Sequence, residues 1–200
     1  EYEDYIEFTF GQWGPDEGEV PNLDNAYGLG FMSANTGGSR VSGIETSITG
    51  RWTTRSFQAD FITGYTYTNP ISTTPDYNYN PDPEGATTTY MSTSYNTEGM
   101  LLKYRSPHVV RFDVQVSGQK FFGGMSMRYQ TALKNFDAAF IEFEESSNLS
   151  GINWGVRGWL EEHPELPWIF DARFGREWPN GHKLSLVISN LTNAEYTIRP

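Results

Sequence analysis

The sequence contains no cysteine and no long apolar run. Without cysteine, disulfides and thiolate metal sites are excluded. Mean hydropathy is −0.55, and no apolar stretch approaches the roughly 20 residues that a membrane-spanning helix needs. These absences exclude a helical membrane protein. They do not exclude a membrane β-barrel, because barrel strands alternate apolar residues with polar ones.

Basic residues are also scarce. Lysine and arginine number 14 against 25 acidic residues, which gives a formal net charge of −11. This balance argues against nucleic acid as a partner. The start of the chain has no charged, apolar and small-residue series typical of a signal peptide. It opens directly on the strand-like EYEDYIEFTF, from which we expect a mature or internal fragment of a longer polypeptide.

Aromatic residues are abundant instead. The chain has 13 Phe, 12 Tyr and 6 Trp, a composition that favours strands over helices. About seven segments of roughly ten residues alternate apolar and polar side chains with the period of two that marks a strand. They are YIEFTFG, VSGIETSITGRW, FQADFITGYTYT, VRFDVQVSG, FFGGMSMRYQ, WIFDARFGREW and LSLVISN.

The connections between these segments alternate in length. Short links are expected at 53–56, 117–120 and 179–182, and the last of these, PNGH, is a hairpin signal. Long links are expected at about 69–98 and 134–166, with a short helix in NWGVRGWLEEHPELP that ends at Pro164 and Pro167. Short turns at one end and long loops at the other are typical of an outer-membrane barrel.

The alternation divides the side chains of each strand into a charged set and an apolar set. The charged set is Glu45, Asp60, Arg111, Asp113, Arg128, Asp171 and Arg173. The apolar set is Phe57, Phe61, Val110, Phe112, Val114, Phe170, Phe174, Leu184, Leu186 and Ile188. In a barrel the charged set lines the lumen or faces a plug, and the apolar set faces lipid. In a soluble sandwich the apolar set is core and the charged set faces solvent.

Two further features bear on this choice. Aromatic residues fall near strand ends, where their rings would meet lipid headgroups in a barrel. They are Trp52, Trp168, Trp178, Tyr65, Tyr67 and Tyr129. The charged pairs Arg111/Asp113 and Asp171/Arg173 are interpreted as structural pairing between neighbouring strands rather than as substrate contacts. The aromatic placement favours the all-β antiparallel transmembrane barrel.

The remaining residues that could carry catalysis or bind a ligand are mostly interpreted as ordinary turn and loop residues. His108, His163 and His182 are scattered, without catalytic or metal-ligand spacing. The stretch NTGGSR lacks the Lys-Ser/Thr of a phosphate loop, and no cofactor is expected. The acidic groups Asp76/Asp82/Glu84 and Glu142/Glu144/Glu145 are expected in solvated loops rather than in a Ca²⁺ site or a glycosidase pair. Tyr77, Tyr79, Trp154 and Trp159 are loop aromatics that would contact a substrate or a lid protein.

Six stretches occur in a fixed order along nearly the whole chain: DYIEFTFGQW, NTGGSRVSGIETSITG, GYTYTNP, LLKYRSPHVVRFDV, FDARFGREW and LSLVISNLTNAEYTIRP. This ordered set resembles the C-terminal part of the barrel of TonB-dependent outer-membrane receptors, in the versions of Bacteroidota-type bacteria. The resemblance implies a 22-stranded barrel of which this chain, residues 1–200, supplies about seven strands. The plug, the TonB-contacting segment, the earlier strands and the closing strand after Arg199–Pro200 would lie elsewhere.

The resemblance also implies a function. The whole protein would be a receptor in the bacterial outer membrane that admits a siderophore, cobalamin, oligosaccharide or peptide, with no catalytic residues of its own. Its partners would be lipid, TonB, and a surface lipoprotein lid or a larger outer-membrane complex. The alternative is a secreted, soluble β-sandwich that binds or cleaves polysaccharide, which detergent dependence would separate from the receptor.

Overall fold

A computed structural model describes residues 1–13, 29–81, 87–148 and 155–196 of the 200-residue chain. These residues form two antiparallel sheets, one of six strands and one of two. The prediction of an all-β chain with antiparallel strands is therefore confirmed. The larger sheet is not closed, since its strands run in chain order from one edge, β3, to the other, β8.

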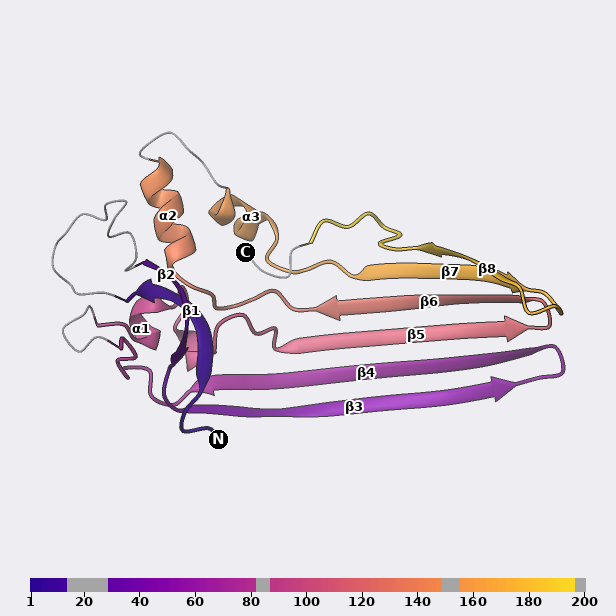
Figure 1. Cartoon of the computed structure of the whole chain (residues 1–200), viewed down its shortest axis with the longest axis horizontal. Helices are drawn as coiled ribbons and strands as arrows, with labels where there is room; N and C mark the ends of the chain where they lie inside the picture. The colour runs from indigo at the N-terminus through magenta and orange to yellow at the C-terminus, as the bar shows by residue number, and fades with distance from the viewer. Residues whose placement is uncertain (14–28, 82–86, 149–154, 197–200) are drawn as a thin grey trace.

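The six-stranded sheet dominates the molecule (Figure 1). Its strands are β3 Ser39–Thr53, β4 Phe57–Ser72, β5 His108–Gly118, β6 Phe121–Gln130, β7 Ile169–Glu177 and β8 Lys183–Ile188. Each strand pairs with the next along the chain. The alternation of β-branched and aromatic residues with polar ones suits such a pleated surface. β3 and β4, with 15 and 16 residues, are longer than the roughly ten residues that the sequence predicts.

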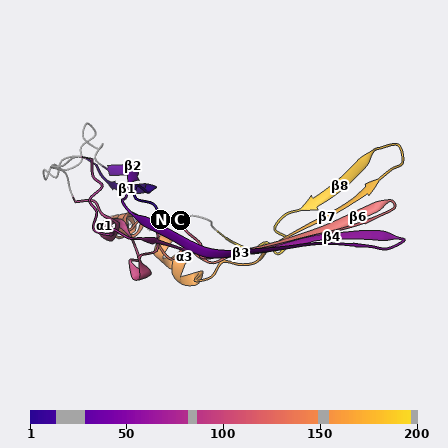
Figure 2. The ribbon, with the colours of Figure 1, turned by 90° about the horizontal axis from the view of Figure 1, so that it is seen from below.

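The connections confirm the predicted alternation. Short turns join β3 to β4, β5 to β6 and β7 to β8 at one end of the sheet, which we call the hairpin end (Figure 1). The β4–β5 and β6–β7 connections both lie at the opposite end, the loop end. Seen from below, the long sheet is a thin single layer (Figure 2). Among the described strands, no second sheet covers either of its faces.

The smaller elements gather at the loop end (Figure 1). They are the strands β1 Ile6–Gln12 and β2 Leu29–Asn35, and the helices α1 Tyr90–Thr93, η2 Glu98–Met100, α2 Ala139–Asn148 and α3 Val156–Glu162. α1 begins at a capping box in which Thr89 and Ser92 satisfy each other's backbone N–H groups. None of the described helices has both the length and the apolarity needed to cross a bilayer.

Several local predictions are tested by these elements. α3 confirms the helix expected before Pro164, although its first expected residues, 153–154, lie outside the described residues. β2 was not predicted, because its sequence LGFMSAN has weak alternation and contains a glycine. The interpretation of Glu142–Glu145 as a solvated loop is wrong: the segment belongs to α2, and Glu144 is buried.

The buried core of the described residues sits at the loop end. Its apolar members include Tyr90, Leu102, Phe136 and Ile141, none more than 7% exposed. They come from α1, α2 and the two long connections. The six-stranded sheet contributes little to this core, because most of its apolar side chains remain accessible.

Candidate functional site

The register of the six strands places all of the predicted apolar side chains on one face of the sheet, the apolar face. Rows of directly paired residues run across the strands; Phe61, Val114 and Met125 form part of one such row, which ends at Ile188. Many of these side chains are uncovered. Ile44, Trp52 and Leu184 are 64%, 65% and 67% exposed. Large uncovered apolar surfaces are typical of sites that meet another protein or a membrane.

Aromatic rings lie at both ends of the apolar face. At the hairpin end, Trp52 on β3 packs edge-on against Phe57 on β4, with ring centroids 5.7 Å apart. Phe121 on β6 stacks on Phe174 at 5.8 Å. Each pair joins two neighbouring strands, so aromatic rings lie on both sides of β5 near the turns.

The loop end of the apolar face has its own aromatic level. Tyr129 on β6 stacks on Trp168 with centroids 4.6 Å apart. His108 lies against Tyr67 at 4.9 Å, and its Nδ1 shares a hydrogen bond of 2.9 Å with the Tyr65 hydroxyl. His108 is therefore part of an aromatic cluster rather than an isolated turn residue.

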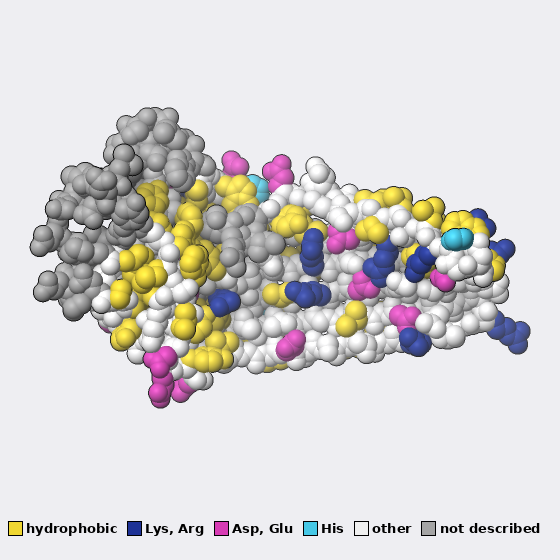
Figure 3. All heavy atoms as spheres, viewed as in Figure 1, with side chains coloured by type: hydrophobic (Ala, Val, Ile, Leu, Met, Phe, Trp, Pro, Cys, Tyr) yellow, Lys and Arg dark blue, Asp and Glu magenta, His cyan; other side chains and the backbone are white. Residues whose placement is uncertain are grey.

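The same register places all of the predicted charged side chains on the other face, the charged face. Acidic and basic side chains are spread along the middle of the sheet in the view of Figure 3. Arg173 on β7 donates from Nη1 and Nη2 to the two oxygens of Asp113 on β5, at 2.8 and 2.7 Å. Ser126, on the strand between them, donates to the same carboxylate at 2.5 Å. This bidentate pair links three strands.

Gly124 on β6 makes this link possible. A Cβ at Gly124 would lie 2.7 Å from Arg173 Nε and 2.6 Å from the Val114 carbonyl oxygen. The absence of a side chain there lets the arginine cross β6 and reach β5. The sequence predicted structural pairing of these charges between neighbouring strands. The arginine in fact reaches past its neighbouring strand to the next one.

A second pair lies near the hairpin end. Arg51 Nε donates to Asp60 Oδ1 at 2.5 Å, and Gln58 donates to Asp60 Oδ2 at 2.7 Å. Arg51 and Asp60, together with Asp113 and Arg173, border a shallow hollow of about 650 Å³ on the charged face. The face is mostly polar, though Ile62 and Val187 also lie on it.

The other predicted charges differ in their partners. Asp171 accepts a hydrogen bond from the backbone N–H of Asn190 at 2.8 Å. Arg111 and Arg128 are directly opposite each other on β5 and β6, and neither forms an ion pair with a described carboxylate. Glu45 pairs in register with Thr66. Of the residues Arg111 and Asp113, only Asp113 forms an ion pair, with Arg173.

The loop end contains a buried ion pair that sequence reasoning missed. Lys103 Nζ lies 2.6 Å from Asp137 Oδ1, and the two residues are 1% and 0% exposed. Lys103 also donates to Thr9 Oγ1 at 2.6 Å and to Thr93 Oγ1 at 2.7 Å. The Tyr104 hydroxyl donates to Asp137 Oδ2 at 2.6 Å. We call this group the loop-end cluster.

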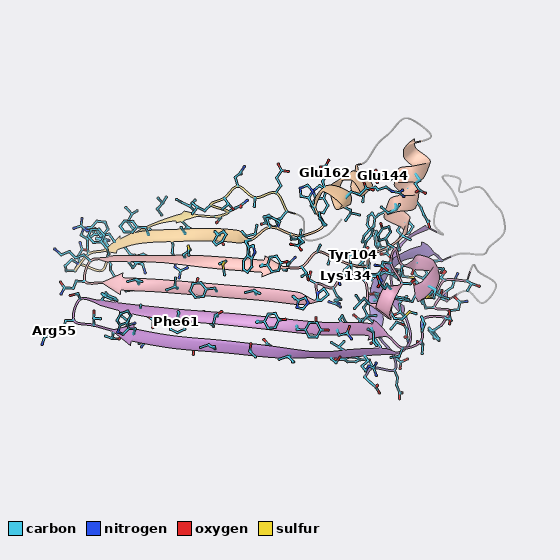
Figure 4. The ribbon with its side chains drawn as sticks, turned by 180° about the vertical axis from the view of Figure 1, so that it is seen from behind. Arg55, Phe61, Tyr104, Lys134, Glu144 and Glu162 are labelled. Atoms are coloured by element: carbon cyan, nitrogen blue, oxygen red, sulfur yellow. The ribbon has the colours of Figure 1, made fainter. Side chains whose placement is uncertain are left out.

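The loop-end cluster joins β1 to both long connections. Its members are separated by up to 128 residues in sequence. Because no local motif relates them, their spacing in the sequence gave no indication of the cluster. Burial raises the pKa of Tyr79 to about 12, and Tyr79 shares a hydrogen bond of 2.6 Å with Thr93. Burial and the neighbouring Asp137 carboxylate also raise the pKa of Tyr104. Figure 4 shows Tyr104 at the loop end and Arg55 at the opposite, hairpin end of the sheet.

Burial also changes the acid–base behaviour of Glu7, beside this cluster. Loss of hydration raises its pKa from 4.5 to about 7, against the opposing influence of Lys103. Its Oε1 has no hydrogen-bond partner among the described residues. Glu7 is a polar residue in the alternating segment YIEFTFG, and nothing in that alternation indicates that its side of the strand is buried.

The remaining sequence candidates are dispersed. His163, the residue after α3, stacks on Trp159 of that helix. Glu144 and Glu145 both contact Arg157 at the start of α3. Tyr77, Asp76 and His182 stand apart from these contacts in loops and turns, whereas Asp82, Glu84 and Trp154 lie outside the described residues. In the described part of the chain, no three histidine or acidic side chains form a group that suits a metal ion.

Comparisons of the chain with known protein families, with curated proteins and with solved structures gave no match.

Proposed function

We propose that this chain forms part of the wall of a transmembrane β-barrel in the bacterial outer membrane. The observation that carries the proposal is the uncovered apolar face with an aromatic level at each end. A soluble protein would cover such a surface with a second layer. A barrel leaves it open to lipid and places aromatic rings at the two interfaces.

The height of the apolar face supports this proposal. Phe57 and Tyr67 mark its two aromatic levels on β4 and are ten residues apart. At about 3.4 Å per residue this separation is about 34 Å along the strand. Tilting the strand by about 40° reduces it to about 26 Å along the membrane normal, close to the roughly 25 Å apolar band of outer-membrane barrels.

The orientation follows from the connections. Outer-membrane barrels have short periplasmic turns and long extracellular loops. The hairpin end would then face the periplasm, and the loop end, with β1, β2 and the helices, would face the outside. The charged face would line the lumen, and its Asp113–Arg173 pair, which is partly exposed and joined by two hydrogen bonds, suits such a place.

As to activity, we propose a TonB-dependent receptor that takes up a scarce nutrient and has no catalytic function. The support for this step is the ordered resemblance of six sequence stretches. The cargo would be a siderophore, cobalamin, oligosaccharide or peptide. The further partners would be TonB, acting through a region outside this chain, and a surface lipoprotein lid or a larger outer-membrane complex.

The absence of native cysteine permits a direct topological test. Glu98→Cys introduces a thiol at an exposed position of η2, at the loop end. Gln119→Cys introduces one in the exposed β5–β6 turn, at the hairpin end. The full-length protein in intact cells is treated with a membrane-impermeant maleimide, and lysed cells serve as the accessibility control.

The proposal predicts that the thiol at position 98 is labelled in intact cells and that the thiol at position 119 reacts only after lysis. Equal labelling of both, or recovery of the native protein in a detergent-free soluble fraction, would contradict it. The receptor activity is tested separately: deletion of the gene should abolish uptake of one of the four nutrient classes, and collapse of the proton gradient should do the same.

A further inference from the structure

The arginine Arg176 of β7 lies on the apolar face, near the hairpin end. It pairs in register with Phe121 of β6 and with Leu184 of β8. Directly paired residues of neighbouring strands project from the same face of a sheet. Phe121 and Leu184 are 48% and 67% exposed on the apolar face. A positive charge is therefore placed on a surface that is otherwise apolar.

Two aromatic rings hold the guanidinium group of Arg176. Its Cζ lies 5.3 Å from the ring centroid of Phe121 and 5.0 Å from that of Trp178. A guanidinium group within about 6 Å of a ring centroid is attracted to the ring. Since Phe121 also stacks on Phe174, Arg176 lies at the level of the hairpin-end rings.

Arg176 has no anionic partner among the described residues. No described carboxylate forms an ion pair with it. The neighbouring Glu177 pairs in register with Lys183 on the charged face. The Nε of Arg176 is buried without a hydrogen-bond partner, whereas Nη1 and Nη2 remain accessible. These two nitrogens carry most of the N–H donors of the guanidinium group, and they are open to an acceptor from outside.

The turns of the hairpin end add further positive charge. Arg55 and Lys120 are exposed there, and neither forms an ion pair with a described carboxylate. Lys and Arg side chains are visible at this end in Figure 3, and Figure 4 labels Arg55. The nearby Asp60 is already paired with Arg51. In a chain of net charge −11, this end favours an anionic surface.

From these contacts we infer that Arg176 binds the phosphate group of a phospholipid at the hairpin end of the apolar face. A phosphate accepts two parallel hydrogen bonds from one guanidinium group, here from the accessible Nη atoms. The acyl chains would lie over Phe174 and Leu186, which are paired in register and 56% and 63% exposed. This apolar neighbourhood selects a lipid rather than a free anion.

The inference deepens the proposed function, because it names a lipid ligand for the apolar face, and it rests on that proposal for the membrane. In the proposed orientation the lipid belongs to the periplasmic leaflet. A positive charge costs about 2–4 kcal/mol at the middle of a bilayer but at most about 1 kcal/mol near the interface. The position of Arg176 beside the hairpin-end rings agrees with an interfacial site.

Native mass spectrometry of the purified full-length protein in detergent micelles tests the inference. The probes are dimyristoylphosphatidylglycerol and dimyristoylglycerol, which has the same acyl chains and no phosphate, and inorganic phosphate is the competitor. The variants are Arg176→Gln and Arg176→Lys. The control is Lys183→Gln, which removes a second cation of the hairpin end. Its Nζ lies 4.3 Å from the ring centroid of Phe122, but on the charged face.

The wild type should bind the phospholipid more tightly than dimyristoylglycerol. Arg176→Gln should weaken phospholipid binding about fivefold, the effect of one basic residue at a lipid surface. Arg176→Lys should retain part of the affinity, because lysine keeps the charge but lacks the paired N–H groups. Lys183→Gln should bind like the wild type, and millimolar inorganic phosphate should not displace the lipid.

The inference is overturned if Arg176→Gln binds the phospholipid like Lys183→Gln, or if dimyristoylglycerol binds the wild type as tightly as the phospholipid does. Displacement by millimolar inorganic phosphate would also overturn it, since a free anion would then suffice. Thermal unfolding in detergent confirms that Arg176→Gln is folded. Binding in micelles does not depend on membrane orientation, so its failure is distinguishable from a failure of the cysteine-labelling test.

Discussion

Arg173 on β7 crosses Gly124 on β6 and holds both carboxylate oxygens of Asp113 on β5, at 2.7 and 2.8 Å. A single side chain thus reaches from β7 across β6 to β5 on the charged face. The pair is partly exposed, so its own contribution to stability is modest, about 1 kcal/mol. Its larger consequence is steric, because it requires the position between the two strands to remain a glycine.

The first prediction concerns that glycine. Gly124→Ala should destabilise the protein by about 1–3 kcal/mol, because the new methyl group would meet both the Val114 carbonyl and the Arg173 side chain. Gly64→Ala is the matched control on the same face, where the nearest atom to a Cβ is 3.7 Å away. Thermal unfolding in detergent measures both variants, and an equal loss in the two would refute the steric account.

The second prediction concerns the buried Lys103–Asp137 pair. Asp137→Asn should destabilise the loop end by about 3–5 kcal/mol, because it leaves the buried ammonium of Lys103 without a counter-charge. The double variant Lys103→Met/Asp137→Asn should recover part of this loss. Amide hydrogen exchange of β1 measures the local free energy of opening. Additive effects of the two substitutions would show that the charges are not coupled.

The third prediction concerns the pH dependence of the same region. The pKa of Glu7 is about 7 in the folded state against 4.5 as its ordinary value. Between these values the folded state retains a proton that the locally opened state has lost. Stability should therefore be fully present below about pH 4.5 and fall as pH rises towards 7, by about 3 kcal/mol in total.

The charged groups that act on Glu7 are Lys103, Asp137 and Arg105. Hydrogen exchange of β1 at pH 5 and pH 8, corrected for the intrinsic exchange rates, measures the effect. Glu7→Gln should remove most of the difference. A wild-type protein whose β1 is equally protected at both pH values would contradict the prediction.

The fourth prediction concerns the apolar face. Phe112→Arg should cost about 2–4 kcal/mol of folding free energy in lipid vesicles, because it places a charge near the middle of the apolar band. Ser47→Arg is the control on the charged face, opposite Gly64, and should cost under about 1 kcal/mol. A similar cost for both variants would argue that the two faces have the same surroundings.

The strands and their two faces could be predicted from the sequence because they depend on local alternation. Val110, Phe112 and Val114 differ from Arg111 and Asp113 at every step, and any antiparallel partner preserves that division. The short turns were likewise marked by their own residues, as in PNGH at 179–182. These features need no information from distant parts of the chain.

The structure of the loop end could not be predicted in this way. Thr9 contacts Asp137 at 2.7 Å across 128 residues of sequence, and only the folded β1 brings them together. α2 was missed because the glutamates of AFIEFEESSN were interpreted as a solvated loop, although glutamate is a good helix former, and because the segment ends in the weaker helix formers Ser and Asn. Burial of Glu7 depends on the same long-range packing.

The central claim is that the apolar face meets lipid. The most direct test is a scan of single cysteines, each with a nitroxide label, at positions 110 to 114 of β5 in the full-length protein in bilayers. Oxygen, which concentrates in lipid, should relax the labels at 110, 112 and 114, and a water-soluble nickel complex those at 111 and 113. Uniform accessibility along β5, or a period of two with the opposite sign, would contradict the account.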